Sequence, residues 1–92
     1  MKNKMIKQYV RNSRGVPIGA LVAVQREAGN VVDFGWSLCH KIDQFSKEKG
    51  TLIARNRALS LKNINIPETL TEPMNLFMDR AERYFYPENI VV

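Results

Sequence analysis

Cysteine and histidine are scarce in this chain of 92 residues, which contains one of each. A single cysteine cannot form a disulfide within the chain, so we expect a protein of a reducing, cytoplasmic compartment. One cysteine and one histidine also fall short of the ligands of a protein zinc site, and we expect no metal or other cofactor. Long apolar runs are missing too. No segment approaches the roughly 20 apolar residues of a membrane span, and we expect no membrane partner.

Catalytic patterns are missing as well. The nine Asp and Glu residues are scattered, which argues against a pair of carboxylates for acid–base catalysis. Cys39 and His40 are adjacent. Adjacent side chains of an extended chain point to opposite faces, so His40 is badly placed to activate Cys39, and we expect a buried structural thiol. The sequence therefore predicts a protein that is not an enzyme, although an enzyme whose site is assembled between subunits stays open.

The apolar pattern predicts an ordered single domain over residues 1–92, since 45% of the residues are hydrophobic and only four are proline. Period-two alternation comes first and helical spacing follows, which is typical of an α+β fold. The expected strands cover about 5–11, 17–26 and 31–39, and the expected helices about 46–61 and 72–86. The middle strand is apolar on both faces and is expected to be central. We predict a three-stranded antiparallel meander followed by two helices packed on one face of the sheet.

Both expected helices begin with capping signals. Asp43 or Ser46 can cap the first helix. Thr71 or Glu72 can cap the second, with Pro73 in its first turn, where a proline is tolerated.

Basic residues are concentrated in the first two-thirds of the chain. Residues 1–62 hold twelve Lys and Arg against four Asp and Glu, a net charge of +8, whereas residues 63–92 have a net charge of −3. This asymmetry indicates an anionic partner, or two halves that pair within or between subunits. The free N–H groups at the start of the first helix would add to the attraction. We predict an anion- or phosphate-binding site formed by Lys41, Lys47, Lys49, Arg55 and Arg57.

The same cluster has a plainer interpretation, in which its cations form a solvated helix face or pair with acids of the second helix. Aromatic residues would add to a nucleic-acid site only if they face outward. The alternation of the third strand instead points Trp36 towards the core, and Tyr9 stays open.

The stretch from Gly35 to Ala58 is the most distinctive of the chain. It begins Gly-Trp-Ser-Leu-Cys, continues as Lys-x-Asp-x-Phe-x-Lys from Lys41, and ends with Gly50 followed by Ile-Ala and Arg-Ala pairs. This pattern resembles a group of small tailed-phage proteins, over roughly residues 18–58. The resemblance implies a non-enzymatic phage accessory protein of the host cytoplasm that binds and inhibits a host factor or sequesters an anionic defence ligand.

A nucleic-acid-binding module is the alternative, in which the basic two-thirds of the chain contacts the phosphate backbone. Ser46 and Lys47 followed by Ala54 and Ala58 are similar to a helix of double-stranded-RNA-binding domains, but the helix that precedes the strands in that family is missing here. The expected partner is a host protein or a phosphate-bearing ligand, either a nucleotide or a nucleic acid. We also predict a homodimer.

Overall fold

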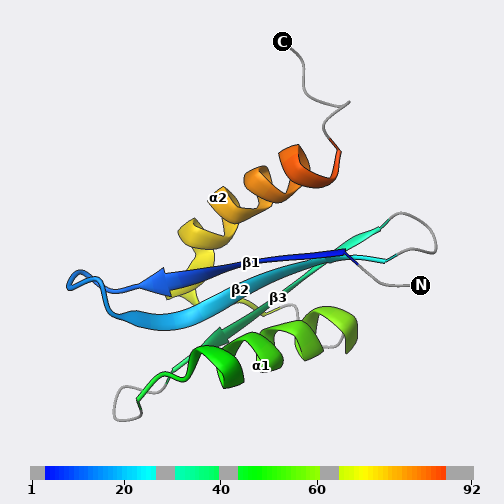
Figure 1. Ribbon diagram of the computed structural model, residues 1–92. Coiled ribbons are helices and arrows are strands. Elements are labelled where there is room, and N and C mark those ends of the chain that lie inside the picture. The colour runs from blue at the N-terminus through cyan, green and yellow to red at the C-terminus, as the bar shows by residue number, and fades with distance from the viewer. Residues whose placement is uncertain (1–3, 27–30, 40–43, 61–64, 87–92) are drawn as a thin grey trace.

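The helices and strands follow one another in the predicted order. The computed structural model describes residues 4–26, 31–39, 44–60 and 65–86, so Lys41, His40 and Asp43 lie outside the described residues. The elements are β1 (Lys4–Arg11), β2 (Pro17–Gln25), β3 (Val32–Leu38), α1 (Lys47–Ser60) and α2 (Glu68–Phe85). An antiparallel meander followed by two helices that pack against the sheet confirms the α+β prediction (Figure 1).

The central strand of the sheet is β2, which pairs antiparallel with β1 on one side and with β3 on the other. Val22 is opposite Lys7 of β1 and opposite Gly35 of β3. Directly opposite residues share a face of the sheet, so these three positions face the same side. As a consequence, β1 and β3 are the two edges.

A tight turn joins β1 to β2. The backbone N–H groups of Arg14 and Val16 donate to Asn12 Oδ1 at 2.9 and 3.1 Å. Gly15 has a φ of 79°, in the left-handed region that favours glycine. The Asn-Ser-Arg-Gly cluster therefore forms the chain reversal between the two strands.

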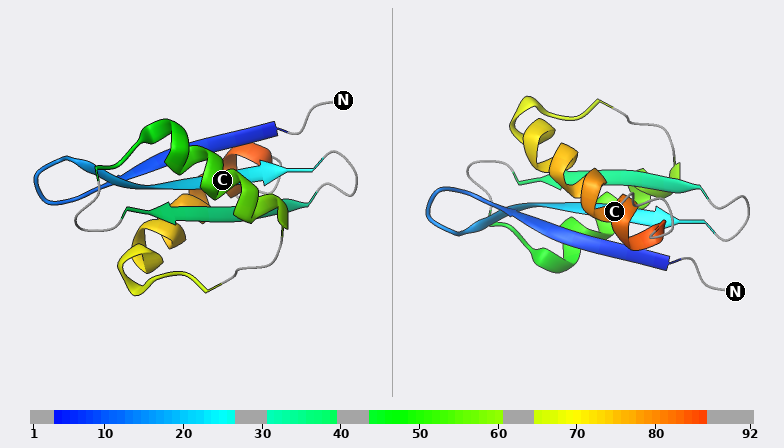
Figure 2. Two further views of the ribbon diagram at one scale, coloured as in Figure 1. Left: turned by 90° about the horizontal axis from the view of Figure 1, so that it is seen from below. Right: turned by 90° about the horizontal axis from the view of Figure 1, so that it is seen from above.

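The two helices cover opposite faces of the sheet, so the prediction that both pack on one face is wrong (Figures 1 and 2). α2 packs on the face with Leu21 and Ala23 of β2, and α1 packs on the face with Ala20, Val22 and Val24. All five of these side chains are at most 1% exposed. The physical reason is that β2 is apolar on both faces, and burying both of them requires one layer on each side.

Small residues bring α1 close to β3. A Cβ atom on Gly35 would overlap the carbonyl oxygen of Ala54 and lie 2.6 Å from the backbone nitrogen of Ala58. Gly50, Ala54 and Ala58 are all buried and follow one another at intervals of four residues. This spacing places them on one side of the helix. Because these residues have small side chains or none, that side of the helix can contact the strand backbone directly.

The longer helix, α2, presents larger apolar side chains to its face of the sheet: Leu70, Met74, Phe77, Ala81 and Phe85. Phe77 packs edge-on against Phe34 of β3, with the ring centroids 6.2 Å apart. α2 begins at Glu68 rather than near residue 72, and Pro73 lies inside the helix rather than in its first turn. Burial of Leu70 explains the earlier start, because it offsets the hydrogen bond that Pro73 cannot donate.

Candidate anion-binding site

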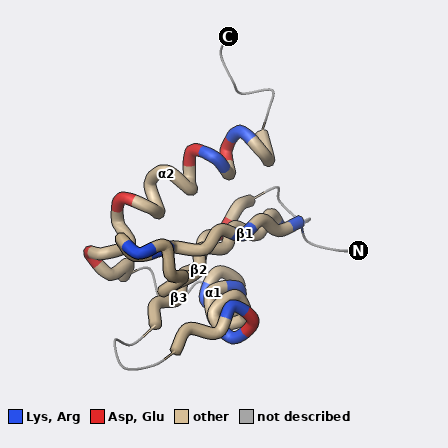
Figure 3. Tube along the Cα trace, turned by 60° about the vertical axis from the view of Figure 1, so that its left-hand side comes forward, with Lys and Arg blue, Asp and Glu red and all other residues tan. Residues whose placement is uncertain are grey.

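Cations outnumber acids on β1 and α1, whereas α2 carries both signs with an excess of acids (Figure 3). The cations of β1, of the turn between β1 and β2, and of α1 are Lys4, Lys7, Arg11, Arg14, Lys47, Lys49, Arg55 and Arg57. Glu48 is the one acidic residue in those segments, whereas α2 has four acidic residues and two arginines. Because the sheet separates the helices, the acids of α2 do not neutralise α1. Within the described ranges, the ion pair that forms joins Arg26 to Asp33 at 2.6 Å.

The described members of the predicted site point in different directions around α1. Lys47 lies over Tyr9 of β1, with its Nζ 5.1 Å from the ring centroid. Lys49 lines a pocket at the start of the helix, Arg55 is exposed, and Arg57 contacts β3. The structure therefore places Lys47 and Lys49 at the beginning of α1 but does not gather all four cations in one cluster.

Arg57 is occupied by contacts within the protein. Its Nη1 donates a hydrogen bond to the main-chain oxygen of Trp36 at 2.9 Å, and its guanidinium carbon lies 4.0 Å from the centroid of the Trp36 ring. Trp36 itself is half-buried and packs against the core under α2, as its alternation predicted. We therefore assign Arg57 to holding α1 against β3.

A pocket of about 520 Å³ lies where the end of β3 meets the first turn of α1. This volume is within the range of small-molecule sites. The walls combine apolar side chains with polar ones, among them Leu38, Phe45, Ile53, Ser37, Ser46 and Lys49. Lys49 is the one charged side chain among the described lining residues, and none of them is acidic. The pocket therefore favours a ligand with negative charge.

Ser37 brings an unpaired polar group to this pocket. The residue is 4% exposed, and its Oγ has no hydrogen-bond partner among the described residues. A buried hydroxyl without a partner costs about 1–3 kcal/mol, which a ligand that bonds to it would recover. Gly50 keeps the space beside this hydroxyl open, since a Cβ atom there would lie 3.1 Å from Ser37 Oγ.

The first turn of α1 adds backbone donors near the pocket. Of the two predicted caps, Ser46 caps the helix, because its Oγ accepts the N–H of Lys49 at 3.2 Å. Helix geometry leaves the N–H groups of Lys47 and Glu48 without an acceptor inside the helix. These groups and the positive end of the helix dipole favour an anion at this end.

Cys39 is half-buried and lines the same pocket, whereas a buried thiol was predicted. Its backbone N–H donates to the carbonyl oxygen of Ile18 at 2.7 Å. The strand pairing therefore continues one residue beyond Leu38, and it places Cys39 at the pocket rather than in the core.

A second cationic position, on the seam between β1 and α1, was missed from the sequence. The Nζ atoms of Lys7 and Lys47 lie 5.8 and 5.1 Å from the centroid of the Tyr9 ring. The Thr51 hydroxyl donates to Tyr9 Oη at 3.5 Å, and this contact, together with the positive charge of both lysines, lowers the pKa of the Tyr9 phenol. The available signal was the alternation of β1, which places Lys7 and Tyr9 on one face.

Comparison of the chain with protein-family models, with curated proteins and with solved structures found no match. Neither described helix is long and apolar enough to cross a membrane.

Proposed function

We propose that this protein is a non-enzymatic binding protein that sequesters a small anionic ligand in the pocket between the end of β3 and the start of α1. One observation supports the proposal best. The Lys49 ammonium and the buried, unpartnered Ser37 hydroxyl line the same pocket. A cation and a buried hydrogen-bonding group at one site are suited to an anionic oxygen.

The chemistry of the walls narrows the class of ligand. Lys49 and the first turn of α1 would face a phosphate or carboxylate, whereas Phe45 and Ile53 would contact an apolar part of the same molecule. A nucleotide combines a phosphate with a flat, weakly polar ring system. We therefore take a nucleotide as the first ligand to test.

The resemblance to small tailed-phage proteins supplies the biological setting of the proposal. In the host cytoplasm, a phage accessory protein of this kind would withdraw an anionic defence ligand by binding it. Such a role needs affinity and no turnover. Inhibition of a host protein is the other role implied by the resemblance, and the lysate experiment below separates the two.

Titration calorimetry with adenosine monophosphate, adenosine and inorganic phosphate tests the pocket. We expect the nucleotide to bind more tightly than either fragment, because it alone reaches both the polar and the apolar walls. Lys49→Ala should lower its affinity roughly tenfold or more, since hydrogen bonds to charged groups contribute about 1.5–3 kcal/mol. Arg55→Ala is the matched control, because Arg55 is an exposed cation of the same helix. Equal losses in both variants would argue against the pocket.

Incubation with a bacterial lysate tests whether the protein sequesters a small anion or binds a host protein. The protein is recovered, and the molecules that it retains are identified by mass spectrometry, with Lys49→Ala as the blank. A small anion retained by the wild type and lost from the variant supports sequestration. A host protein retained equally by both would favour inhibition of that protein, and retention of neither would count against both roles.

A further inference from the structure

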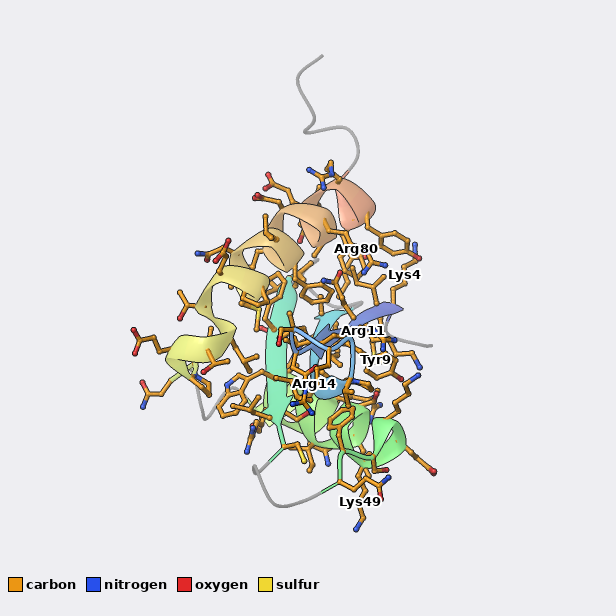
Figure 4. The ribbon with its side chains drawn as sticks, turned by 90° about the vertical axis from the view of Figure 1, so that its left-hand side faces the viewer. Lys4, Tyr9, Arg11, Arg14, Lys49 and Arg80 are labelled. Atoms are coloured by element: carbon orange, nitrogen blue, oxygen red, sulfur yellow. The ribbon has the colours of Figure 1, made fainter. Side chains whose placement is uncertain are left out.

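The seam between β1 and α1 is a second surface, which adjoins the pocket at Phe45, and Tyr9 is at its centre (Figure 4). The Tyr9 ring packs edge-on against Phe45, with the centroids 6.3 Å apart, and its Oη accepts a hydrogen bond from Thr51. These contacts hold the ring from the α1 side. Tyr9 is half-buried, so part of the aromatic side chain remains in contact with solvent.

Two ammonium groups from different elements converge on this ring. Lys7 comes from β1 and Lys47 from α1, and both side chains are exposed. Neither lysine pairs with an acidic side chain in the part of the chain that the structure describes. Two positive charges beside one ring attract an anion to this surface. The Thr51 hydrogen bond lowers the pKa of the Tyr9 phenol, and the charges of Lys7 and Lys47 lower it further.

Further cations continue the surface along β1. Arg11 and Arg14 lie at the end of the strand and in the turn that follows, whereas Lys4 shares the face of Ile6 and Val10 and points towards α2 (Figure 4). Arg80 of α2 reaches the same strand from the other face, with its Nη1 3.0 Å from Gln8 Oε1. A row of cations beside an aromatic ring is typical of surfaces that bind single-stranded nucleic acid.

We propose that the β1–α1 seam binds single-stranded nucleic acid. Backbone phosphates bind the ammonium groups of Lys7 and Lys47, which lie over the Tyr9 ring in the free protein, and a base stacks on the ring face that they leave. An acidic peptide would satisfy the cations but would offer the ring no planar partner. A duplex keeps its bases stacked inside, where Tyr9 cannot reach them. The single strand alone uses both the charge and the ring.

Fluorescence anisotropy with a labelled 20-nucleotide oligo(dT) tests this proposal. For single strands, the slope of log K against log[salt] changes by roughly 0.7 for each phosphate contact. We expect the double variant Lys7→Ala/Lys47→Ala to weaken binding and to reduce that slope by about 1.4. Tyr9→Leu should weaken binding roughly tenfold and leave the slope unchanged, because stacking releases no counterions.

Arg83→Ala is the control, since it removes an exposed cation from α2 on the opposite face of the sheet. Circular dichroism of each variant checks folding, and Tyr9→Phe keeps the ring if Tyr9→Leu does not fold. Equal binding of a duplex or of poly-glutamate would overturn the proposal, as would a loss in Arg83→Ala equal to that in the double variant. Lys49→Ala should bind the oligonucleotide normally, so failure of the pocket and failure of the seam are distinguishable.

Discussion

Arg80 of α2 lies across the free edge of β1, where its Nη1 approaches the carbonyl oxygen of Lys7 at 3.4 Å. At the opposite edge, Arg57 of α1 donates a hydrogen bond to the carbonyl oxygen of Trp36 on β3. Each helix thus places one arginine on a carbonyl of an edge strand. Unpaired strand edges are templates for pairing with other chains, and these two arginines obstruct both edges.

Replacement of Arg57 tests its structural role. We expect Arg57→Ala to lower the free energy of unfolding by about 1–3 kcal/mol, because it removes a hydrogen bond and the stacking on Trp36. Arg57→Lys should recover little, since lysine has neither the planar group nor the fork of donors. Urea denaturation gives the stability, and light scattering reports self-association at the opened edge of β3. Arg55→Ala should stay within about 0.5 kcal/mol of the wild type, and similar values for both arginines would contradict the assignment.

Replacement of Gly35 tests the close contact between α1 and β3. In Gly35→Ala, the added methyl group meets the backbone of Ala54 and Ala58, which cannot move without displacing the helix. We expect a loss of about 3 kcal/mol in thermal or urea denaturation. Gly15→Ala is the comparison, because its Cβ would meet nothing within 4 Å and only its backbone conformation is strained. That variant should lose about 1 kcal/mol. A Gly35→Ala protein as stable as Gly15→Ala would show that α1 packs less closely than described.

The lowered pKa of Tyr9 predicts an early alkaline titration. Thr51→Val and Lys47→Ala should each raise this pKa, because they remove the hydrogen bond and one positive charge that favour the phenolate. A pKa that is lower in the folded than in the unfolded state stabilises the fold only at alkaline pH, as the phenol ionises, and has no effect at neutral pH. Carbon-13 NMR of labelled tyrosine, assigned with Tyr9→Phe, measures the shift. An unchanged titration in both variants would contradict the geometry around Tyr9.

Replacement of Gly50 separates ligand binding from stability. A Cβ atom there would lie 2.5 Å from the Phe45 ring, so we expect the ring to move and to change the wall of the pocket. The affinity for adenosine monophosphate should fall in Gly50→Ala. The free energy of unfolding should change little. Alanine favours the helix by about 1 kcal/mol over glycine, and this gain offsets the cost of moving the Phe45 ring. Calorimetry and urea denaturation on the same sample give both values, and undiminished affinity would exclude Phe45 as a wall of the site.

Much of the fold followed from short-range pattern. Alternation of apolar residues predicted the three strands, and Ser46 gave the start of the first helix. The side of the sheet on which each helix packs depends on contacts between distant segments, which periodicity does not report. The apolar character of both faces of β2 was the available signal. Ala20 and Leu21 lie on opposite faces and are both fully buried, so each face needs its own helix. The start of α2 was misplaced because Pro73 suggested a first turn, and burial of Leu70 outweighed that signal.

The candidate site was predicted less completely. Clustering in the sequence suggested one anion site, but successive residues of a helix point about 100° apart, so Lys47 and Lys49 diverge. Much of the distinctive stretch turns out to serve packing, since Gly35, Gly50 and Arg57 all lie in the contact between α1 and β3. The convergence of Lys7 with Lys47 joins residues forty positions apart, and only the tertiary structure brings them together. The homodimer, the partner and the phage setting stay predictions.

The contact between Gly35 and Ala54 also bears on how the seam meets a ligand. The backbone of β3 contacts the backbone of α1 there. The distance between α1 and the sheet is therefore set by main-chain atoms rather than by side chains that can adjust. The backbone positions from which Lys7 and Lys47 extend are consequently set before anything binds, and only the two side chains adjust. A strand that binds here has to order two side chains but has to move no helix, so less of its binding energy is lost on rearrangement.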